Sequence, residues 1–127
     1  MCSRIPPDVD YIIAPESRGY IFGPTIANKL GKGFVPIRKH GKLPEDLVIC
    51  VEYQKEYGPD ILCLPKNTNY TNKNFYFVDD IMATGGTLNA SKKLIEKCGG
   101  NYVGGLVYIN ISFLNNEKIE YIKEETN

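Results

Sequence analysis

The segment Phe-Val-Asp-Asp-Ile-Met-Ala-Thr-Gly-Gly-Thr, at residues 77–87, constrains this chain more than any other. An apolar strand is predicted over residues 74–78, and it ends at two carboxylates, Asp79 and Asp80. A loop with two glycines and two threonines follows, and an amphipathic helix is predicted from about Leu88. Glycines let the backbone come close to a ligand, and the unpaired N–H groups at the positive end of a helix attract anions. The segment therefore predicts a phosphate site at a turn between a strand and a helix.

The two carboxylates beside this turn indicate what else the ligand carries. Asp79 and Asp80 would repel phosphate, so we expect them to face hydroxyl groups or a hard cation such as Mg²⁺. The predicted ligand is a sugar phosphate, with or without a metal ion. The alternative is an ordinary turn capped by a threonine, since Thr and Gly are common at such positions. The carboxylate pair, the two glycines and both threonines occur together, and this combination favours the ligand site.

Length and composition limit the class of protein. The 127 residues allow one domain with its own core, so a single domain over residues 1–127 is expected. Lys and Arg together number 15, as do Asp and Glu, and this balance indicates neither a nucleic-acid partner nor a membrane partner. The sequence shows no signal-peptide pattern and no apolar window of membrane-spanning length, so a soluble cytoplasmic protein is expected.

The cysteines are expected to be free thiols. Cys2, Cys50, Cys63 and Cys98 contain no C-x-x-C pair and lie mostly in apolar runs. This pattern predicts buried thiols in a reducing compartment and makes a zinc site improbable.

Strands and helices are predicted to alternate along the chain. The predicted strands cover residues 9–14, 33–37, 47–53, 61–64, 74–78, 102–111 and about 119–122, and the predicted helices cover 20–30, with Gly31 as C-cap, and about 88–97. This order predicts an α/β fold with a mainly parallel central sheet covered by helices on both faces. Gly104 and Gly105 predict a bulge or a close ligand approach in the last long strand.

Two more polar segments follow predicted strands, at the edge where ligands of such sheets bind. The segment Glu-Ser-Arg-Gly, residues 16–19, supplies an arginine whose planar donors suit phosphate oxygens and a glycine that tolerates unusual backbone angles. Residues 38–42, Arg-Lys-His-Gly-Lys, would be costly to bury without an anionic partner. Taken alone, Arg18 is more typical of a solvated surface residue, and residues 38–42 are equally consistent with a solvated turn. With residues 79–87, they predict three loops that converge on one ligand.

These three segments resemble those of a known family. Residues 77–87 resemble the phosphoribosyl pyrophosphate (PRPP) motif of type I phosphoribosyltransferases, which has an apolar run, two acids, two apolar residues and Ala-Thr-Gly-Gly-Thr. Residues 16–24 and 34–44 are similar to the pyrophosphate-binding segments of the adenine phosphoribosyltransferase subfamily. The resemblance covers about residues 9–114. It implies the type I phosphoribosyltransferase fold, a homodimer, and a purine-salvage reaction of adenine and PRPP, with Mg²⁺, that yields AMP and pyrophosphate.

The resemblance also implies roles for individual residues. Asp79 and Asp80 should bind the ribose hydroxyls, and Ala83, Thr84, Gly85, Gly86 and Thr87 the 5′-phosphate. Pyrophosphate should be bound by Ser17, Arg18, Gly19, Arg38, Lys39 and Lys42. Glu56, Tyr57 and Arg18 are expected to be catalytic: the Glu-Tyr-Gly at 56–58 looks like the family's mobile lid, with Glu56 as the acid that handles the purine proton. No direct metal ligand from the protein is expected, since Mg²⁺ would be held through PRPP and water.

One departure from the family concerns the base. Family members carry several dozen residues ahead of the first strand, and these form a hood over the purine. Only residues 1–8 precede the first predicted strand here, so the hood is expected to be short or absent, and adenine is favoured by similarity alone. Two alternatives stay open: a catalytically impaired regulatory protein that binds PRPP or nucleotide, and a phosphoribosyltransferase for xanthine or hypoxanthine.

Overall fold

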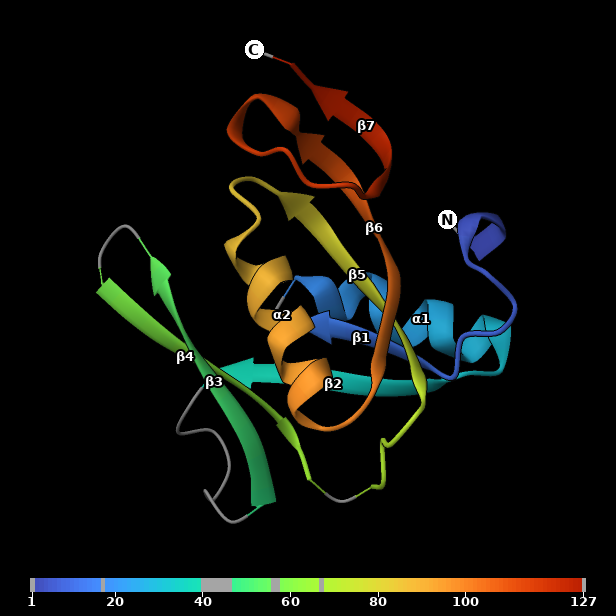
Figure 1. Ribbon diagram of the computed structural model, residues 1–127. Coiled ribbons are helices and arrows are strands. Elements are labelled where there is room, and N and C mark those ends of the chain that lie inside the picture. Colours follow the sequence, from blue (N-terminus) through green and yellow to red (C-terminus); the bar gives the residue numbers. More distant parts are fainter. Residues whose placement is uncertain (1, 17, 40–46, 56–57, 67, 127) are drawn as a thin grey trace.

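The computed structural model describes residues 2–16, 18–39, 47–55, 58–66 and 68–126. Its strands are β1 (Tyr11–Pro15), β2 (Gly33–Lys39), β3 (Val48–Lys55), β4 (Gly58–Pro65), β5 (Asn74–Met82), β6 (Asn101–Ile111) and β7 (Glu120–Glu125). The helices are α1 (Gly19–Leu30) and α2 (Gly86–Lys97), with short 3₁₀ turns η1 (Cys2–Arg4) and η3 (Ser112–Leu114). In the described residues the strands form one sheet in the order β3-β4-β2-β1-β5-β6-β7 (Figure 1).

The sheet is mainly parallel, as predicted. β1 pairs in parallel with β2 and β5, β5 with β6, and β6 with β7. The antiparallel part is the β3–β4 hairpin, which joins the sheet where β4 pairs with the end of β2. The carboxyl ends of β1, β2 and β5 therefore lie together, beside this hairpin.

The helices cover opposite faces of the sheet because apolar residues alternate along its strands. In β1, Ile13 packs on the face covered by α2, and Ile12 packs on the face covered by α1 (Figure 1). β5 repeats this alternation. Its α2 face carries Phe75 and Phe77, which pack with Leu88, Leu94 and Ile95, and its α1 face carries Tyr76 and Val78, which pack with Ile26 and Ala27. Each buried Leu, Ile, Val or Phe among these side chains contributes about 1.5–3 kcal/mol on burial. The resulting two-layer core holds both helix N-termini at one edge of the sheet.

Local details of two predicted elements are confirmed. Gly31 is the C-cap of α1, with φ 69°. A bulge interrupts the pairing of β5 with β6, where Phe75 lies opposite Tyr102 and the next residue, Tyr76, lies opposite Gly104. The predicted irregularity at Gly104 is therefore a bulge.

The strand before the predicted phosphate loop is longer than the sequence predicts. β5 continues through Asp79 and Asp80 to Met82, and Asp79 still pairs with Val107 of β6. α2 begins at Gly86, two residues before the predicted start. The two carboxylates are therefore fixed by a sheet strand, which holds them more firmly than a loop would.

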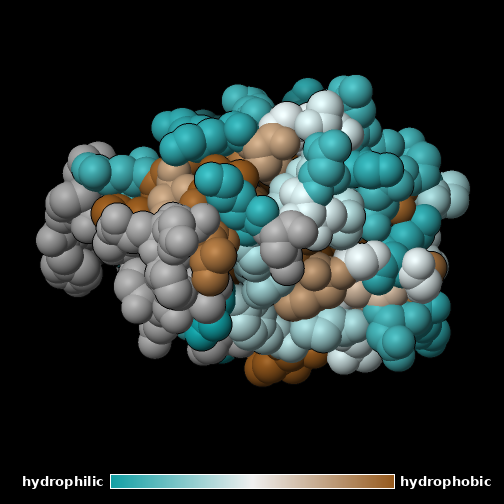
Figure 2. All heavy atoms as spheres, turned by 90° about the horizontal axis from the view of Figure 1, so that it is seen from below, coloured by the Kyte–Doolittle hydropathy of each residue, from teal (hydrophilic) through white to brown (hydrophobic). Residues whose placement is uncertain are grey.

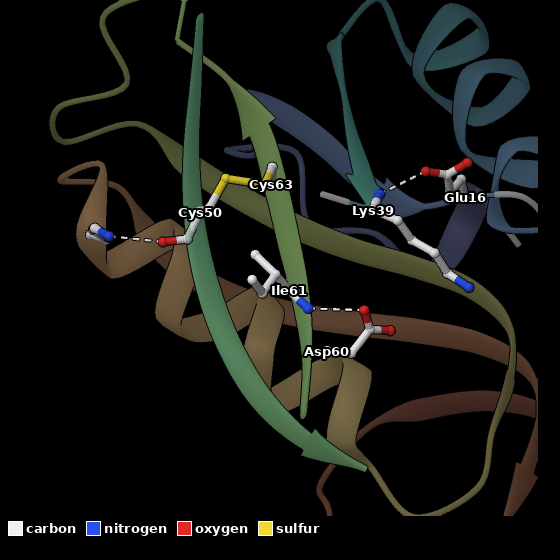
Figure 3. Close-up of a disulfide and its surroundings, with 7 residues drawn as sticks. Glu16, Lys39, Cys50, Asp60, Ile61 and Cys63 are labelled. Carbon is white, nitrogen blue, oxygen red and sulfur yellow. Dashed lines mark hydrogen bonds between the residues drawn. A yellow bond between two sulfur atoms is a disulfide. The ribbon is translucent and has the colours of Figure 1, made fainter. Parts of the chain in front are cut away.

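The prediction of free thiols is wrong for two of the cysteines. Cys50 in β3 and Cys63 in β4 form a disulfide, and they lie directly opposite each other with Cα atoms 4.1 Å apart (Figure 3). This distance is typical of a non-hydrogen-bonded antiparallel pair. Among the cysteine side chains that the structure describes, Cys98 is free, and burial raises its thiol pKa. The pairing depends on the hairpin register, which cysteine spacing alone does not reveal.

The surface is mixed in polarity. Seen from below, hydrophilic residues cover much of the molecule and hydrophobic residues occur between them in separate groups (Figure 2). In the described part of the chain, neither helix is long and apolar enough to cross a membrane.

Candidate active site

A cavity of about 320 Å³ lies at the carboxyl ends of β1, β2 and β5. The starts of α1 and α2 and the β3–β4 hairpin complete its walls. Its lining residues are Pro15, Glu16, Arg18, Lys39, Tyr53, Leu62, Phe77 and residues 79–88. All three segments that the sequence predicts to converge contribute to this one cavity. It lies at the sheet edge where parallel α/β proteins bind their ligands.

The loop at one end of the cavity has the geometry of an anion site. Ala83 and Thr84 follow β5, and Gly85 is the N-cap of α2 with φ 88°, a left-handed angle that favours glycine. No side chain in the described structure caps this helix start. The first N–H groups of α2 have no acceptor within the helix, so they are available to an anion at its positive end. The alternative of a threonine N-cap does not match the structure.

Asp79 and Asp80 occupy the middle of the cavity wall. The Asp80 N–H donates to Asp79 Oδ1 at 2.8 Å, and the Ile81 N–H donates to Asp80 Oδ1 at 2.8 Å. Burial, followed by a side-chain hydrogen bond with Asp80, raises the pKa of Asp79 to about 7, and the nearby Arg18 charge opposes this shift. A half-buried acceptor pair of this kind suits a ligand that brings hydroxyl donors.

Arg18 also lines the cavity and is the N-cap residue of α1. Its Nε lies 3.1 Å from Asp80 Oδ2, so the guanidinium and the carboxylate form an ion pair. The next residue must be small, because a Cβ on Gly19 would lie 2.9 Å from Pro15 Cδ and 3.1 Å from Asp79 Oδ1. Gly19 thus lets the start of α1 approach the carboxylates closely.

Glu16 ties the end of β1 to the end of β2. The Lys39 N–H donates to Glu16 Oε1 at 2.6 Å (Figure 3). Beside this contact, the Tyr20 hydroxyl donates to the Ile37 carbonyl at 2.8 Å, and burial, followed by the Glu16 charge, raises the pKa of Tyr20 to about 12. Tyr20 is therefore a neutral hydrogen-bond donor here. These contacts hold the Lys39 backbone at the cavity edge.

The two basic residues at the end of β2 are separated by the pleat of the strand. Lys39 lines the cavity, whereas Arg38 is not among its described lining residues. Successive side chains of a strand point to opposite faces, so Arg38 lies on the α1 face. Its Nε atom is buried and has no hydrogen-bond partner among the described residues.

Several predicted site residues lie outside the described residues: Ser17, Lys42, Glu56 and Tyr57. Their roles stay predictions. Of the others, Arg18, Lys39, Asp79, Asp80, Ala83, Thr84, Gly85, Gly86 and Thr87 line the cavity, and Gly19 supports it from the start of α1.

Sequence reasoning missed three residues at or next to the site. Tyr53 and Leu62, on neighbouring strands of the hairpin, line the cavity. The period-two pattern of β3, in which Ile49, Val51 and Tyr53 share a face, is the signal that could have placed Tyr53. Asn115 donates to the Ala83 carbonyl from behind the loop, and no local sequence signal indicates this contact.

The described residues contain no group of three or more His, Cys, Asp or Glu side chains that could hold a metal ion. The carboxylates on the cavity wall come from Asp79, Asp80 and Glu16; Asp79 accepts a hydrogen bond from the Asp80 backbone N–H, and Asp80 pairs with Arg18. This set offers oxygen atoms of the kind that Mg²⁺ prefers, but too few for a cage made of protein alone.

Comparison with known proteins agrees with this geometry. The family profile described as "Phosphoribosyl transferase domain" matches residues 5–124. The chain is 47% identical over 108 residues to an adenine phosphoribosyltransferase of Acetivibrio thermocellus, a match that covers 85% of this chain and 63% of the relative. The chain thus spans less than two thirds of the length of that relative.

Solved structures with the same fold include two adenine phosphoribosyltransferases. The enzyme of Saccharomyces cerevisiae, complexed with D-2,5-dideoxy-2,5-imino-altritol 1,6-bisphosphate and adenine, matches with TM-score 0.79 and 44% identity over 84% of this chain and 60% of that one. The enzyme of Thermoanaerobacter pseudethanolicus matches with TM-score 0.84 and 39% identity over 91% of this chain and 70% of that one. These matches confirm the type I phosphoribosyltransferase fold expected from the sequence.

Proposed function

The chain belongs to the phosphoribosyltransferase family, and from this premise we propose that it transfers the phosphoribosyl group of PRPP to adenine, forming AMP and pyrophosphate. The observation that carries the proposal is that one cavity joins a helix N-terminus, the carboxylates of Asp79 and Asp80, and the cations of Arg18 and Lys39. These groups match the three parts of PRPP, namely its 5′-phosphate, its ribose hydroxyls and its pyrophosphate.

In this proposal each wall of the cavity holds one part of the substrate. The N–H groups of the 83–87 loop bind the 5′-phosphate, because they lie at the positive end of α2. Asp79 and Asp80 accept hydrogen bonds from the ribose hydroxyls. Arg18 and Lys39 bind the pyrophosphate, supported by Ser17, Gly19 and Lys42.

The reaction forms a bond from a purine nitrogen to the anomeric carbon and breaks the bond from that carbon to pyrophosphate oxygen. Positive charge develops on the ribose ring, where the Asp79 and Asp80 carboxylates favour it. Negative charge develops on the departing pyrophosphate, where Arg18 and Lys39 favour it. Charges fixed in advance in this way can make the largest single contribution to catalysis.

The proposal includes Mg²⁺ as a cofactor. The fit rests on the donor set, because Asp79 and Asp80 supply oxygen atoms at the cavity wall and no described cluster could cage the ion alone. Asp79 and Asp80 would therefore reach the ion through water and PRPP oxygens. Bound Mg²⁺ supplies positive charge next to the pyrophosphate.

The hairpin carries the proposed lid. Glu56 and Tyr57 lie between β3 and β4, and Tyr53 and Leu62 of the same hairpin line the cavity. Glu56 would accept or relay the purine proton, a contribution of about 10²- to 10⁴-fold in rate. Closure of the lid would exclude water from the activated sugar.

We also propose a homodimer of single-domain subunits spanning residues 1–127. The family resemblance of residues 34–44 supports the dimer, because basic residues of this segment would bind pyrophosphate across a subunit interface. Sedimentation would distinguish a dimer from a monomer.

A turnover assay tests the proposed activity. The full chain is incubated with PRPP, Mg²⁺ and adenine, and AMP is quantified by chromatography. We expect AMP formation, lost in the Asp79→Asn, Asp80→Asn double variant. A folded protein that binds PRPP but turns over neither adenine, hypoxanthine nor xanthine would instead be a binding protein, and turnover of the oxopurines alone would reassign the base.

A further inference from the structure

The rear of the phosphate loop is held by a short segment that follows β6. Asn115 and Glu117, just beyond η3, contact the loop and the first turns of α2. Neither is among the described residues that line the cavity.

Asn115 connects the loop to the end of β6. Its Nδ2 lies 2.7 Å from the Ala83 carbonyl oxygen, 3.1 Å from Asn110 Oδ1 and 3.1 Å from the Ile111 carbonyl oxygen. The amide has two N–H donors, so one of them is shared between acceptors. Asn110 is 4% exposed and fixed in β6, so Asn115 connects Ala83 to the buried sheet.

Glu117 holds the start of α2 from the same side. Its Oε1 accepts from Asn89 Nδ2 at 2.9 Å, and its Oε2 lies 3.6 Å from Lys92 Nζ. Its Cγ would lie only 3.0 Å from a Cβ at Gly85, so the Glu117 stem packs directly against the N-cap. The Glu117 N–H donates to Asn115 Oδ1 at 3.0 Å, which makes the two residues one unit.

The Asn115 contact determines the direction of a peptide group in the cavity wall. In a trans peptide unit, a carbonyl and the following N–H point in opposite directions. The Ala83 carbonyl points to Asn115 behind the loop, so the Thr84 N–H of the same peptide unit points away from Asn115. Ala83 and Thr84 both line the cavity whereas Asn115 does not, so we expect this N–H to face the cavity interior.

We propose that Asn115 is a positioning residue for phosphate binding. Asn115 holds the Ala83–Thr84 peptide so that the Thr84 N–H faces the 5′-phosphate. Glu117 supports this arrangement because it contacts both Asn115 and the helix N-cap, Gly85. This inference rests on the proposed function, because it assigns the phosphate of a phosphoribosyl ligand to the 83–87 loop.

Binding of two different ligands distinguishes a positioning role of Asn115 from a general effect of its substitution on the fold. Ribose 5-phosphate probes the loop, and pyrophosphate probes the opposite end of the cavity at Arg18 and Lys39. Calorimetry on Asn115→Ala should show about tenfold weaker binding of ribose 5-phosphate and unchanged binding of pyrophosphate. Asn115→Asp, which keeps the shape and the acceptor for Glu117 but loses the donor, should show the same pattern. The neighbouring Asn116→Ala is the matched control and should bind both ligands as the unsubstituted chain does.

The outcomes are distinguishable. If the unsubstituted chain binds neither ligand, the proposed function fails and this inference fails with it. If the chain binds both ligands, and a folded Asn115 variant binds ribose 5-phosphate with full affinity, the positioning role alone is overturned. A parallel loss of pyrophosphate binding would also overturn it, because that result indicates general loosening.

A measurement on the unsubstituted chain completes the test. Upon saturation with ribose 5-phosphate, the Thr84 backbone amide proton should shift downfield in the NMR spectrum, as expected for a new hydrogen bond to an anion. An unchanged Thr84 resonance at saturation would overturn the inference even if the Asn115 variants do not fold.

Discussion

Arg18 and Asp80 form an ion pair across the cavity, with Arg18 Nε 3.1 Å from Asp80 Oδ2. The Arg18 side chain is 69% exposed, and the Asp80 side chain is 18% exposed. In the proposed function these residues bind different parts of PRPP, since Arg18 binds pyrophosphate and Asp80 binds ribose. The substrate must therefore separate two residues that bind each other in its absence.

Arg18→Ala should act on the two halves of the ligand differently. Loss of the guanidinium should weaken pyrophosphate binding by about 1.5–3 kcal/mol, or more than tenfold, because a charge-assisted contact is removed. Ribose 5-phosphate should bind as well as before or more tightly, because Asp80 no longer has to be released. Calorimetric titration with each ligand measures both effects.

Lys29→Ala, at the far end of α1, is the matched control and should change neither affinity. Thermal unfolding of Arg18→Ala should change little, because an exposed ion pair contributes only about 0–1 kcal/mol. Equal weakening of both ligands would contradict the assignment of Arg18 to pyrophosphate.

The raised pKa of Asp79 predicts a specific pH dependence of stability. An ordinary aspartate titrates near 3.8, whereas burial, followed by the hydrogen bond with Asp80, raises the pKa of Asp79 to about 7. At pH values between 3.8 and about 7, Asp79 is protonated in the folded state and ionised in the unfolded state. Stability from this group is therefore present below about pH 4, falls as the pH rises to about 7, and is constant above that.

Asp79→Asn should remove this dependence. The variant should gain stability relative to the unsubstituted chain as the pH rises from about 4 to about 7, in unfolding curves recorded at each pH. In Asp80→Asn, loss of the neighbouring carboxylate should move the upper end of this window to lower pH. A constant stability difference across the whole range would show that Asp79 titrates normally.

The two glycines of the loop should respond to alanine with opposite signs. Gly85 has φ 88°, and a Cβ there would lie 3.0 Å from Glu117 Cγ, so Gly85→Ala should destabilise by at least about 1–2 kcal/mol. At Gly86 the nearest atoms to a new Cβ are 3.8 Å away, and its φ is not left-handed. Gly86→Ala should stabilise the helix start by about 0.4–1 kcal/mol. Chemical denaturation measures both changes, and equal effects would contradict the loop geometry.

The Cys50–Cys63 disulfide should stabilise the hairpin that carries the proposed lid. Thirteen positions separate the two cysteines, and closing a loop of this length contributes about 3 kcal/mol to the free energy of unfolding. A thiol reductant should therefore lower the unfolding midpoint. The Cys50→Ser, Cys63→Ser double variant should be insensitive to reductant, whereas Cys98→Ser should still respond. Alkylation of Cys50 and Cys63 in the folded, non-reduced protein would contradict the pairing.

Residues 74–97 show what a sequence can reveal about this site. The strand, the glycine turn and the helix are contiguous, so the local pattern predicts both their order and a phosphate site between them. The carboxylate pair Asp79–Asp80 is also apparent in the local sequence, although the strand extends beyond it to Met82. Features formed by contiguous residues are therefore predictable from the sequence.

Relationships between distant segments were not predictable in the same way. Asn115 reaches Ala83 over 32 positions, and Cys50 reaches Cys63 only because the hairpin register places them opposite. The separation of Arg38 from Lys39 is a different case, because strand alternation alone places their side chains on opposite faces. The prediction of one basic segment over residues 38–42 did not take into account that Arg38 and Lys39 belong to a strand, so that their side chains point to opposite faces.

Calorimetric titration of the full chain with PRPP and Mg²⁺ tests the central claim most directly. We expect saturable binding with one PRPP per chain, and loss of that binding in the Asp79→Asn, Asp80→Asn double variant. A folded chain that gives no heat of binding with PRPP would contradict the account, because the cavity would then not be a phosphoribosyl site.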